Sequence, residues 1–209
     1  MEVYVSKPFG PGIAKVKIPE KILNQLNDYV EKIILDKEKK NKLDHGNNLV
    51  GDVTQELLIE KNIAKEIGWL DFLGQATYHY ILSHTQKKIK EFKLIGTWVV
   101  RQFQNEYNPI HWHGGHISGA GFLKVPSSFG DHLQDKPNKF YQGGNLSLVH
   151  GSKMFLSDPV FNILPEVGDF VLFPNYLMHT VYPFKNSKEE RRSVSFNAFI
   201  DKDIYDVYS

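Results

Sequence analysis

The chain has 209 residues, of which 25 are basic and 24 acidic, so its formal net charge at pH 7 is +1. This length suits one domain, and a charge so near zero supplies no overall field to attract nucleic acid or an anionic membrane. Cysteine is absent, which excludes disulfides, thiolate metal sites and cysteine nucleophiles. Any metal must therefore be held by nitrogen or oxygen.

The N-terminal sequence MEVYVSKPFG lacks the basic segment and apolar stretch of a signal peptide, and no apolar run approaches the roughly 20 residues that span a bilayer. These features predict a cytoplasmic protein. We expect residues 1–209 to form a single domain, in which residues 1–95 are mainly a helical support and residues 96–200 form the β core.

Apolar residues recur at helical spacing in the first part of the chain. From Ile18 to Leu43 they predict one amphipathic helix, with Pro19 suited to its first turn. A polar stretch, from Asp44 to Val53, separates this helix from a second helical region. We expect the faces led by Leu26 and Leu73 to cover an outer sheet of the β core.

From Gly96 onward, short β-rich runs alternate with turn residues. This order favours an α+β architecture, in which helices pack on the outside of a sandwich or barrel. The stretch from Ser127 to Gln142 is predicted to be a long loop over the barrel mouth. The predicted strands are Thr97 to Asn105, His111 to His113, Gly119 to Val125, Asn145 to His150, Asp169 to Phe173 and Ser193 to Ile200.

Three of the nine histidines, His111, His113 and His116, fall within six residues. On a strand, where the side-chain period is two, His111 and His113 point to one face and Trp112 to the other. We therefore expect Trp112 to pack in the core, away from a metal. Two histidines on one face can chelate an ion, although histidines that only hydrogen-bond in a polar strand would have the same spacing.

The segment from Pro165 to His179 has the order turn, buried strand, turn and histidine. In a β-helical barrel this order carries the chain across the barrel and sets a lone histidine at its mouth, where it can complete a site begun by His111 and His113. The three histidines together predict a metal site. Taken alone, His179 also fits a partly buried histidine near Tyr182.

The run from Arg191 to Ile200 alternates between apolar and polar side chains. If the apolar set packs under the N-terminal helices, the polar set lines the barrel interior. A buried guanidinium needs an anionic partner, and a dicarboxylate gripped in bidentate fashion would supply one. An exposed arginine pair beside Glu189 and Glu190 is the alternative. The apolar set is Val194, Phe196, Ala198 and Ile200, and the polar set is Arg191, Ser193, Ser195 and Asn197.

Taken together, these segments resemble the 2-oxoglutarate/Fe(II)-dependent oxygenase superfamily, and in particular the small putative oxygenases of marine bacteria and phages. The likeness extends from Gly96 to Ile200. It rests on Asn108 to His113, Ser118-Gly119 with Phe122, Pro165 to His179, and Arg191 to Asn197. The resemblance implies a double-stranded β-helix, a jelly-roll or cupin-like barrel, with the N-terminal helices packed on one sheet.

The resemblance also implies Fe(II) and 2-oxoglutarate as cofactors. By position, His111, His113 and His179 would be the metal ligands, and Arg191 and Ser193 would clamp the distal carboxylate of 2-oxoglutarate. The implied activity is that of a dioxygenase, which uses O2 to hydroxylate an unknown substrate and converts 2-oxoglutarate to succinate.

The second ligand departs from the superfamily, where a carboxylate usually occupies the position of His113. Asp131 in the following loop could supply that carboxylate, and His116 could replace one of the pair. Arg191, rather than Arg192, is the predicted clamp because it shares the register of Ser193. A β-bulge between Arg191 and Ser193 would instead turn Arg192 toward the interior and Arg191 away from it.

Two other functions also fit the sequence. A cupin-type enzyme could use the same barrel and a three-histidine metal without 2-oxoglutarate. The glutamate expected a few residues after a cupin His-x-His strand is missing, however, and Arg191 with Ser193 would be left without a role. A non-catalytic binding module on the same barrel is the second alternative.

Overall fold

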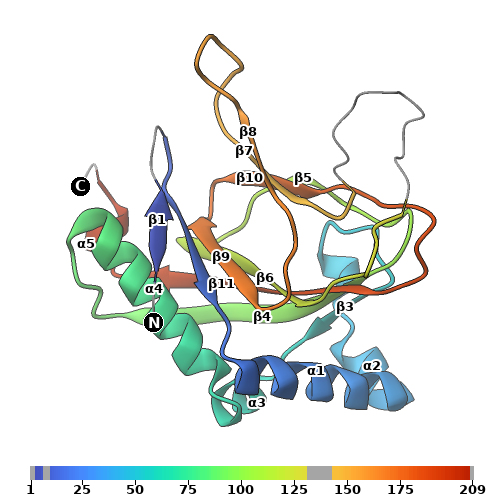
Figure 1. The fold of residues 1–209 in the computed structure, drawn as a ribbon. Helices are drawn as coiled ribbons and strands as arrows, with labels where there is room; N and C mark the ends of the chain where they lie inside the picture. Colours follow the sequence, from blue (N-terminus) through green and yellow to red (C-terminus); the bar gives the residue numbers. More distant parts are fainter. Residues whose placement is uncertain (1–2, 7–9, 131–142, 208–209) are drawn as a thin grey trace.

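The structure is a computed structural model that describes residues 3–6, 10–130 and 143–207. It has two antiparallel sheets with helices on the outer face of the larger one (Figure 1). The helices are α1 (Glu20–Leu35), α2 (Lys37–Leu43), α3 (Lys61–Glu66), α4 (Trp69–Thr85) and α5 (Lys202–Tyr205), with a 3-10 turn η1 (Gly46–Asn48). This arrangement agrees with the α+β architecture predicted from the sequence.

Seven strands form the larger sheet and four form the smaller one. The larger sheet contains, in spatial order, β1 (Tyr4–Ser6), β2 (Ile13–Lys17), β9 (Asp169–Pro174), β6 (Ile117–Lys124), β11 (Arg191–Ile200), β4 (Phe92–Gln102) and β3 (Gln55–Leu58). The smaller sheet contains β5 (Asn108–His111), β10 (Met178–Val181), β7 (Leu146–Val149) and β8 (Val160–Ile163). Strands from both ends of the sequence share the larger sheet, which supports a single domain over residues 1–209, though that division stays a prediction.

The predicted helix from Ile18 to Leu43 is wrong in one respect, because it is two helices. The backbone at Asp36 is extended, with φ −103° and ψ 104°, so α1 ends there. The Asp36 carboxylate then accepts hydrogen bonds from the backbone N–H groups of Glu38 and Lys39. The first backbone N–H groups of a helix have no partner within the helix, and the Asp36 side chain supplies one. Asp36 therefore ends α1 and caps the start of α2.

Three strands that the sequence did not predict lie in residues 1–95, namely β1, β2 and β3. The N-terminal part is therefore more than a helical support. Two further strands, β8 and β10, were also missed, and β10 carries His179. The predicted strand from His111 to His113 is displaced, since β5 ends at His111.

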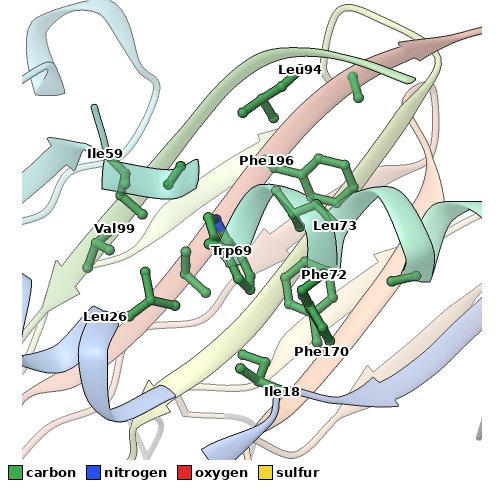
Figure 2. Close-up of a cluster of buried hydrophobic side chains, with 14 of the residues drawn as sticks. Ile18, Leu26, Ile59, Trp69, Phe72, Leu73, Leu94, Val99, Phe170 and Phe196 are labelled. Carbon is green, nitrogen blue, oxygen red and sulfur yellow. The ribbon is translucent and has the colours of Figure 1, made fainter. Parts of the chain in front are cut away.

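The main core lies between the helices and the outer face of the larger sheet (Figure 2). Leu26 of α1 and Leu73 of α4 are fully buried there, so the prediction that their faces cover the outer sheet is confirmed. Trp69 stacks on Phe72 and donates a hydrogen bond from Nε1 to Thr97 Oγ1 over 3.0 Å. The sheet residues beneath include Val99, Phe170, Val194 and Phe196.

A second apolar cluster fills part of the space between the two sheets. Its members from the larger sheet include Phe122, Val171 and Phe173, and those from the smaller sheet include Leu148 and Val181. A cavity lined by residues of both sheets lies beside this cluster. Among the described helices, none combines the length and the apolar composition needed to cross a bilayer.

Candidate active site

Three histidines meet between the sheets, where β5 and β10 pair. His111 lies at the end of β5, directly opposite His179 of β10, and His113 follows two residues after His111. One ligand nitrogen from each ring lies within 4.8 Å of the others. The pairing of two short strands of the smaller sheet therefore brings together residues that are far apart in the sequence.

Backbone carbonyls determine which ring nitrogens face the centre of the cluster. His111 Nδ1 lies 2.7 Å from the Pro109 carbonyl oxygen, and His179 Nδ1 lies 3.0 Å from that of Leu177. A carbonyl can only accept, so both Nδ1 atoms carry the hydrogen and both Nε2 atoms keep a lone pair. His113 Nε2 lies 3.1 Å from His179 Nε2, which is about the separation of adjacent ligands that each lie roughly 2.2 Å from one ion.

Burial keeps these imidazoles neutral. It lowers the pKa of His113 to about 3, with further lowering from His179 and His111. Burial, followed by the charge of His111, lowers the pKa of His179 to about 4, and burial also lowers that of His111. Neutral imidazole is the form that binds metals. Three such nitrogens fit a divalent transition metal such as Fe(II).

The histidines line a cavity of about 210 Å³. Both sheets contribute to its wall, so a molecule bound there would touch β4 and β11 on one side and β5, β7 and β10 on the other. The lining residues include Val100, Leu146, Val181, Arg191, Ser193 and Ser195. The polar face predicted for β11 thus faces the cavity at Arg191, Ser193 and Ser195.

Arg191 is only 1 % exposed and points into this cavity. Its Nε donates to the Gly144 carbonyl over 2.9 Å, and Nη1 donates to Ser193 Oγ over 3.2 Å. Its guanidinium also lies over the Phe122 ring. Burial lowers the pKa of Arg191 to about 9, so the group remains charged at pH 7. Among the described residues no carboxylate pairs with it, and such a desolvated cation requires an anion.

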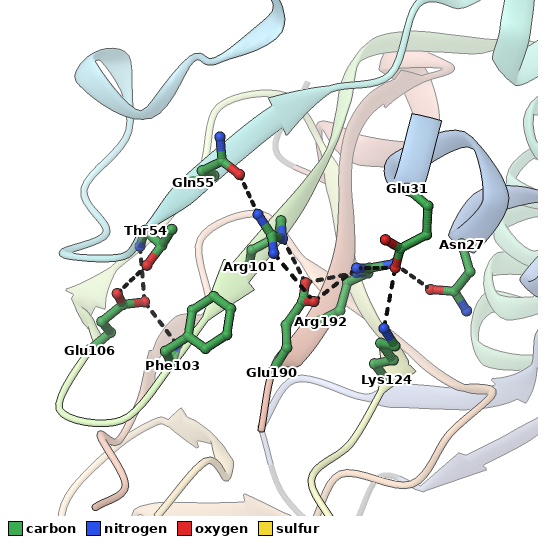
Figure 3. Close-up of polar contacts among 10 residues, drawn as sticks. All are labelled: Asn27, Glu31, Thr54, Gln55, Arg101, Phe103, Glu106, Lys124, Glu190 and Arg192. Atoms are coloured by element: carbon green, nitrogen blue, oxygen red, sulfur yellow. Dashed lines mark hydrogen bonds and ion pairs between the residues drawn. The ribbon is translucent and has the colours of Figure 1, made fainter. Parts of the chain in front are cut away.

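Arg192 faces the opposite way and is fully paired (Figure 3). Its Nη1 donates to Asn27 Oδ1 over 3.0 Å, and Nη2 donates to Glu31 Oε1 over 2.8 Å, so it anchors α1. Its Nε forms a 2.8 Å ion pair with Glu190, which also binds Arg101. The alternation predicted for β11 thus places Arg191 in the interior and Arg192 in the outer layer, and the alternative of an exposed arginine pair does not hold.

A β-bulge lies at this point of the sheet, but the inserted residue belongs to the neighbouring strand, β6. The pairing of β11 with β6 shifts between Arg192 and Ser193, and Leu123 of β6 is the additional residue. Against β4, β11 stays in continuous register from Arg191 to Asn197. Because the inserted residue is not on β11, its side chains keep their faces.

The core role predicted for Trp112 is wrong. Its side chain is 65 % exposed and lines the same cavity as the three histidines. The reason is local: β5 ends at His111, so the period of two does not extend to Trp112 and His113. The alternation argument therefore failed at this position, even though the two histidines converge.

The alternative ligands were His116 and Asp131. His116 stands outside the cluster, because its ring stacks on Tyr205 at 3.9 Å and its Nδ1 lies 3.1 Å from the Ile200 carbonyl oxygen. Asp131 lies outside the described residues, as does most of the predicted loop from Ser127 to Gln142.

Sequence reasoning missed two polar residues of the cavity wall, Glu56 and Asn108. Glu56 lies on β3, which was not predicted as a strand. Asn108 begins the motif from Asn108 to His113, but the sequence did not predict that its side chain lines the cavity. No local signal pointed to this strand, because Gln55 and Glu56 are polar and Leu57 and Leu58 apolar, without the alternation of a half-buried strand.

Solved structures share this architecture. A Pseudomonas putida prolyl-4-hydroxylase has 13% identity, with 90% of this chain and 91% of that chain covered and a TM-score of 0.54. The viral collagen prolyl hydroxylase of Paramecium Bursaria Chlorella virus-1, solved with 2-oxoglutarate, has 14% identity, coverages of 89% and 94%, and a TM-score of 0.55. At such identities the likeness shows the fold, and the predicted double-stranded β-helix is confirmed.

Residues 96–197 match the family model described as putative 2OG-Fe(II) oxygenase. The resemblance to the 2-oxoglutarate/Fe(II) oxygenase superfamily is thereby confirmed, and the expected cofactors, Fe(II) and 2-oxoglutarate, are those of the family's description. A Trichoplax adhaerens prolyl hydroxylase, solved with a hypoxia inducible factor peptide fragment, also shares the fold, with 13% identity, coverages of 94% and 87%, and a TM-score of 0.54. Among curated proteins, none matches the sequence.

Proposed function

We propose that this protein is a dioxygenase that hydroxylates a substrate and converts 2-oxoglutarate to succinate. His111, His113 and His179 hold Fe(II), and Arg191 with Ser193 holds the distal carboxylate of 2-oxoglutarate. The observation that carries this proposal is the fully buried guanidinium of Arg191, which has no carboxylate partner among the described residues and shares a cavity with the three histidines.

Each of these residues has a defined task. The metal, when bound, supplies activation of oxygen. The carbonyls of Pro109 and Leu177 hold two imidazole rings with Nε2 directed at the ion. Arg191 and Ser193 fix one end of the cosubstrate, and the apolar cluster around Phe122 excludes water from that end.

The third histidine changes the charge of the site. Three neutral imidazoles leave the full 2+ charge on the ion, whereas two histidines and a carboxylate would leave one unit less. We therefore expect His113 to strengthen the electrostatic attraction of the doubly anionic cosubstrate and to raise the redox potential of the metal. The cytoplasmic location expected from the sequence stays part of this proposal.

The test is an anaerobic titration with Fe(II) and then 2-oxoglutarate, followed by a succinate assay in air without added substrate. We expect stoichiometric binding of both and slow succinate formation that needs both. Metal binding without 2-oxoglutarate binding would favour a cupin-type three-histidine enzyme, which the histidines alone also fit. The metal titration uses protein purified without a histidine tag. If that protein does not bind the metal, the chain is a non-catalytic module.

A further inference from the structure

Glu56 is a buried carboxyl group that the cosubstrate site does not use. It is 3% exposed and lines the cavity, and its Oε2 accepts no hydrogen bond from any residue that the structure describes. Its neighbours on β3 point the other way. Gln55 contacts Arg101, which lies beside Glu190 and Arg192 (Figure 3), and Leu57 belongs to the main core. The alternation of the strand therefore directs Glu56 inward.

The sheet register places Glu56 away from the cosubstrate clamp. Glu56 pairs with Val100 of β4, and Val100 pairs with Ser193 of β11, so the three form one row across the larger sheet. Neighbouring strands lie about 4.8 Å apart, which separates Glu56 from Ser193 by roughly 10 Å along this row. Glu56 thus forms a second polar end of the cavity, beyond the reach of a carboxylate held at Arg191.

The side-chain amide of Asn108 lies near the other carboxyl oxygen of Glu56, Oε1. The amide oxygen of Asn108, Oδ1, is buried and also unpartnered among the described residues. A methyl group placed on Gly51 would overlap this oxygen and would lie 3.0 Å from Glu56 Oε1, so both oxygens border the same glycine. Buried acceptors without donors are costly. Burial, followed by the charge of Asp44, raises the pKa of Glu56 to about 7.

The wall around these oxygens is apolar and aromatic. Leu49, Val50 and Trp98 line it. Trp98 points inward from the residue two before Val100, and its ring lies 5.7 Å from that of His113. An elongated ligand held at Glu56 would therefore cross the Trp98 ring to reach the histidine cluster. Two acceptors in a cavity that an indole ring also lines suit a cation with several N–H donors.

We propose that Glu56 and Asn108 form a subsite for a protonated amine of the substrate, whose carbon chain lies along Trp98 toward the histidines. The substrate class is then an alkylammonium compound or side chain. That this chain is the part oxidised rests on the proposed function, whereas binding of the ammonium group does not. Glu56 acts here as a specificity residue, because it is not part of the histidine cluster.

Tryptophan fluorescence can measure this binding without turnover. Of the three tryptophans, Trp98 and Trp112 line the cavity and Trp69 is buried in the main core. The protein, with and without Mn(II) and 2-oxoglutarate, is titrated at pH 8 with pentylamine, 1-pentanol and pentanoate. We expect pentylamine to bind most tightly and Glu56→Gln to weaken it by about tenfold or more, the usual effect of losing a charge-assisted hydrogen bond.

The control is Asp52→Asn, which removes the same charge from an exposed side chain just before β3 and should leave pentylamine affinity within about twofold. Equal binding of pentanol and pentylamine, or an unchanged affinity in Glu56→Gln, would overturn the proposal. A large loss of Mn(II) affinity in Glu56→Gln would make Glu56 a metal ligand and would also overturn it. The comparison of the three probes needs no variant, and the succinate assay tests the proposed function separately.

Discussion

Glu56 gives a stability prediction whose size follows from its burial. Its pKa is raised from the ordinary 4.5 to about 7, so the folded protein holds this proton more tightly than the unfolded chain does. The stabilisation from this group is therefore fully present below about pH 4.5 and is lost as the pH rises through about 7. A shift of about 2.5 units at 1.36 kcal/mol each amounts to about 3 kcal/mol.

Replacing Glu56 by glutamine removes the titration while keeping the shape of the side chain. We expect the unfolding free energy of Glu56→Gln, relative to the unchanged protein, to rise by about 2.5 kcal/mol between about pH 5 and about pH 8. Urea unfolding followed by circular dichroism at several pH values measures this difference. Charges elsewhere titrate in both proteins and cancel in the comparison.

Asp52→Asn, which removes one carboxylate from an exposed side chain, is the matched control for the loss of a charge in itself. A constant difference between Glu56→Gln and the unchanged protein over this range would refute the reasoning. It would mean that the Glu56 carboxyl ionises in the folded state as easily as in the unfolded one, through solvent contact or a cation close by.

Three further predictions concern the two faces of β11 and the histidine cluster. His179→Ala should abolish stoichiometric Fe(II) or Mn(II) binding, measured by calorimetry, while the fold stays intact by circular dichroism; retained binding would assign the metal to other residues. Arg191→Ala should weaken 2-oxoglutarate binding by about 2 to 4 kcal/mol and leave metal affinity largely unchanged. Arg192→Ala should lower the unfolding free energy by about 3 kcal/mol, because Glu190 and Glu31 lose this partner. It should have little effect on 2-oxoglutarate affinity. Exchanged effects of the two arginine variants would show that the register of β11 is misassigned.

The sequence predicted β11 well because its two faces carry different chemistry. Val194 and Phe196 require the apolar layer beneath the helices, while Arg191 and Ser193 suit only a polar interior. A slip of one residue would bury the wrong set on both faces, so the pattern determines the register. The same reasoning failed at Trp112, because alternation holds only within a strand and nothing local indicates that β5 ends at His111.

Other elements could not be predicted because long-range contacts decide them. β3 carries Gln55 and Glu56, both buried, and two buried polar residues in a row do not suggest a strand. Its position is set by pairing with β4, which turns Glu56 toward the cavity. Likewise β10 is four residues long, and its pairing with β5 and β7, rather than its composition, makes it a strand and sets His179 opposite His111.

The continuous register of β11 limits how this protein can change during evolution. Deleting Ser193, for example, would move Val194 and Phe196 into the cavity and turn Ser195 and Asn197 toward the helices. Fold and site would be lost in the same event, so this strand tolerates replacement of residues but not changes of length. The turn between β7 and β8, where Phe155 is 92% exposed, carries no such double constraint. Homologues should therefore differ in length there and keep β11 free of insertions and deletions.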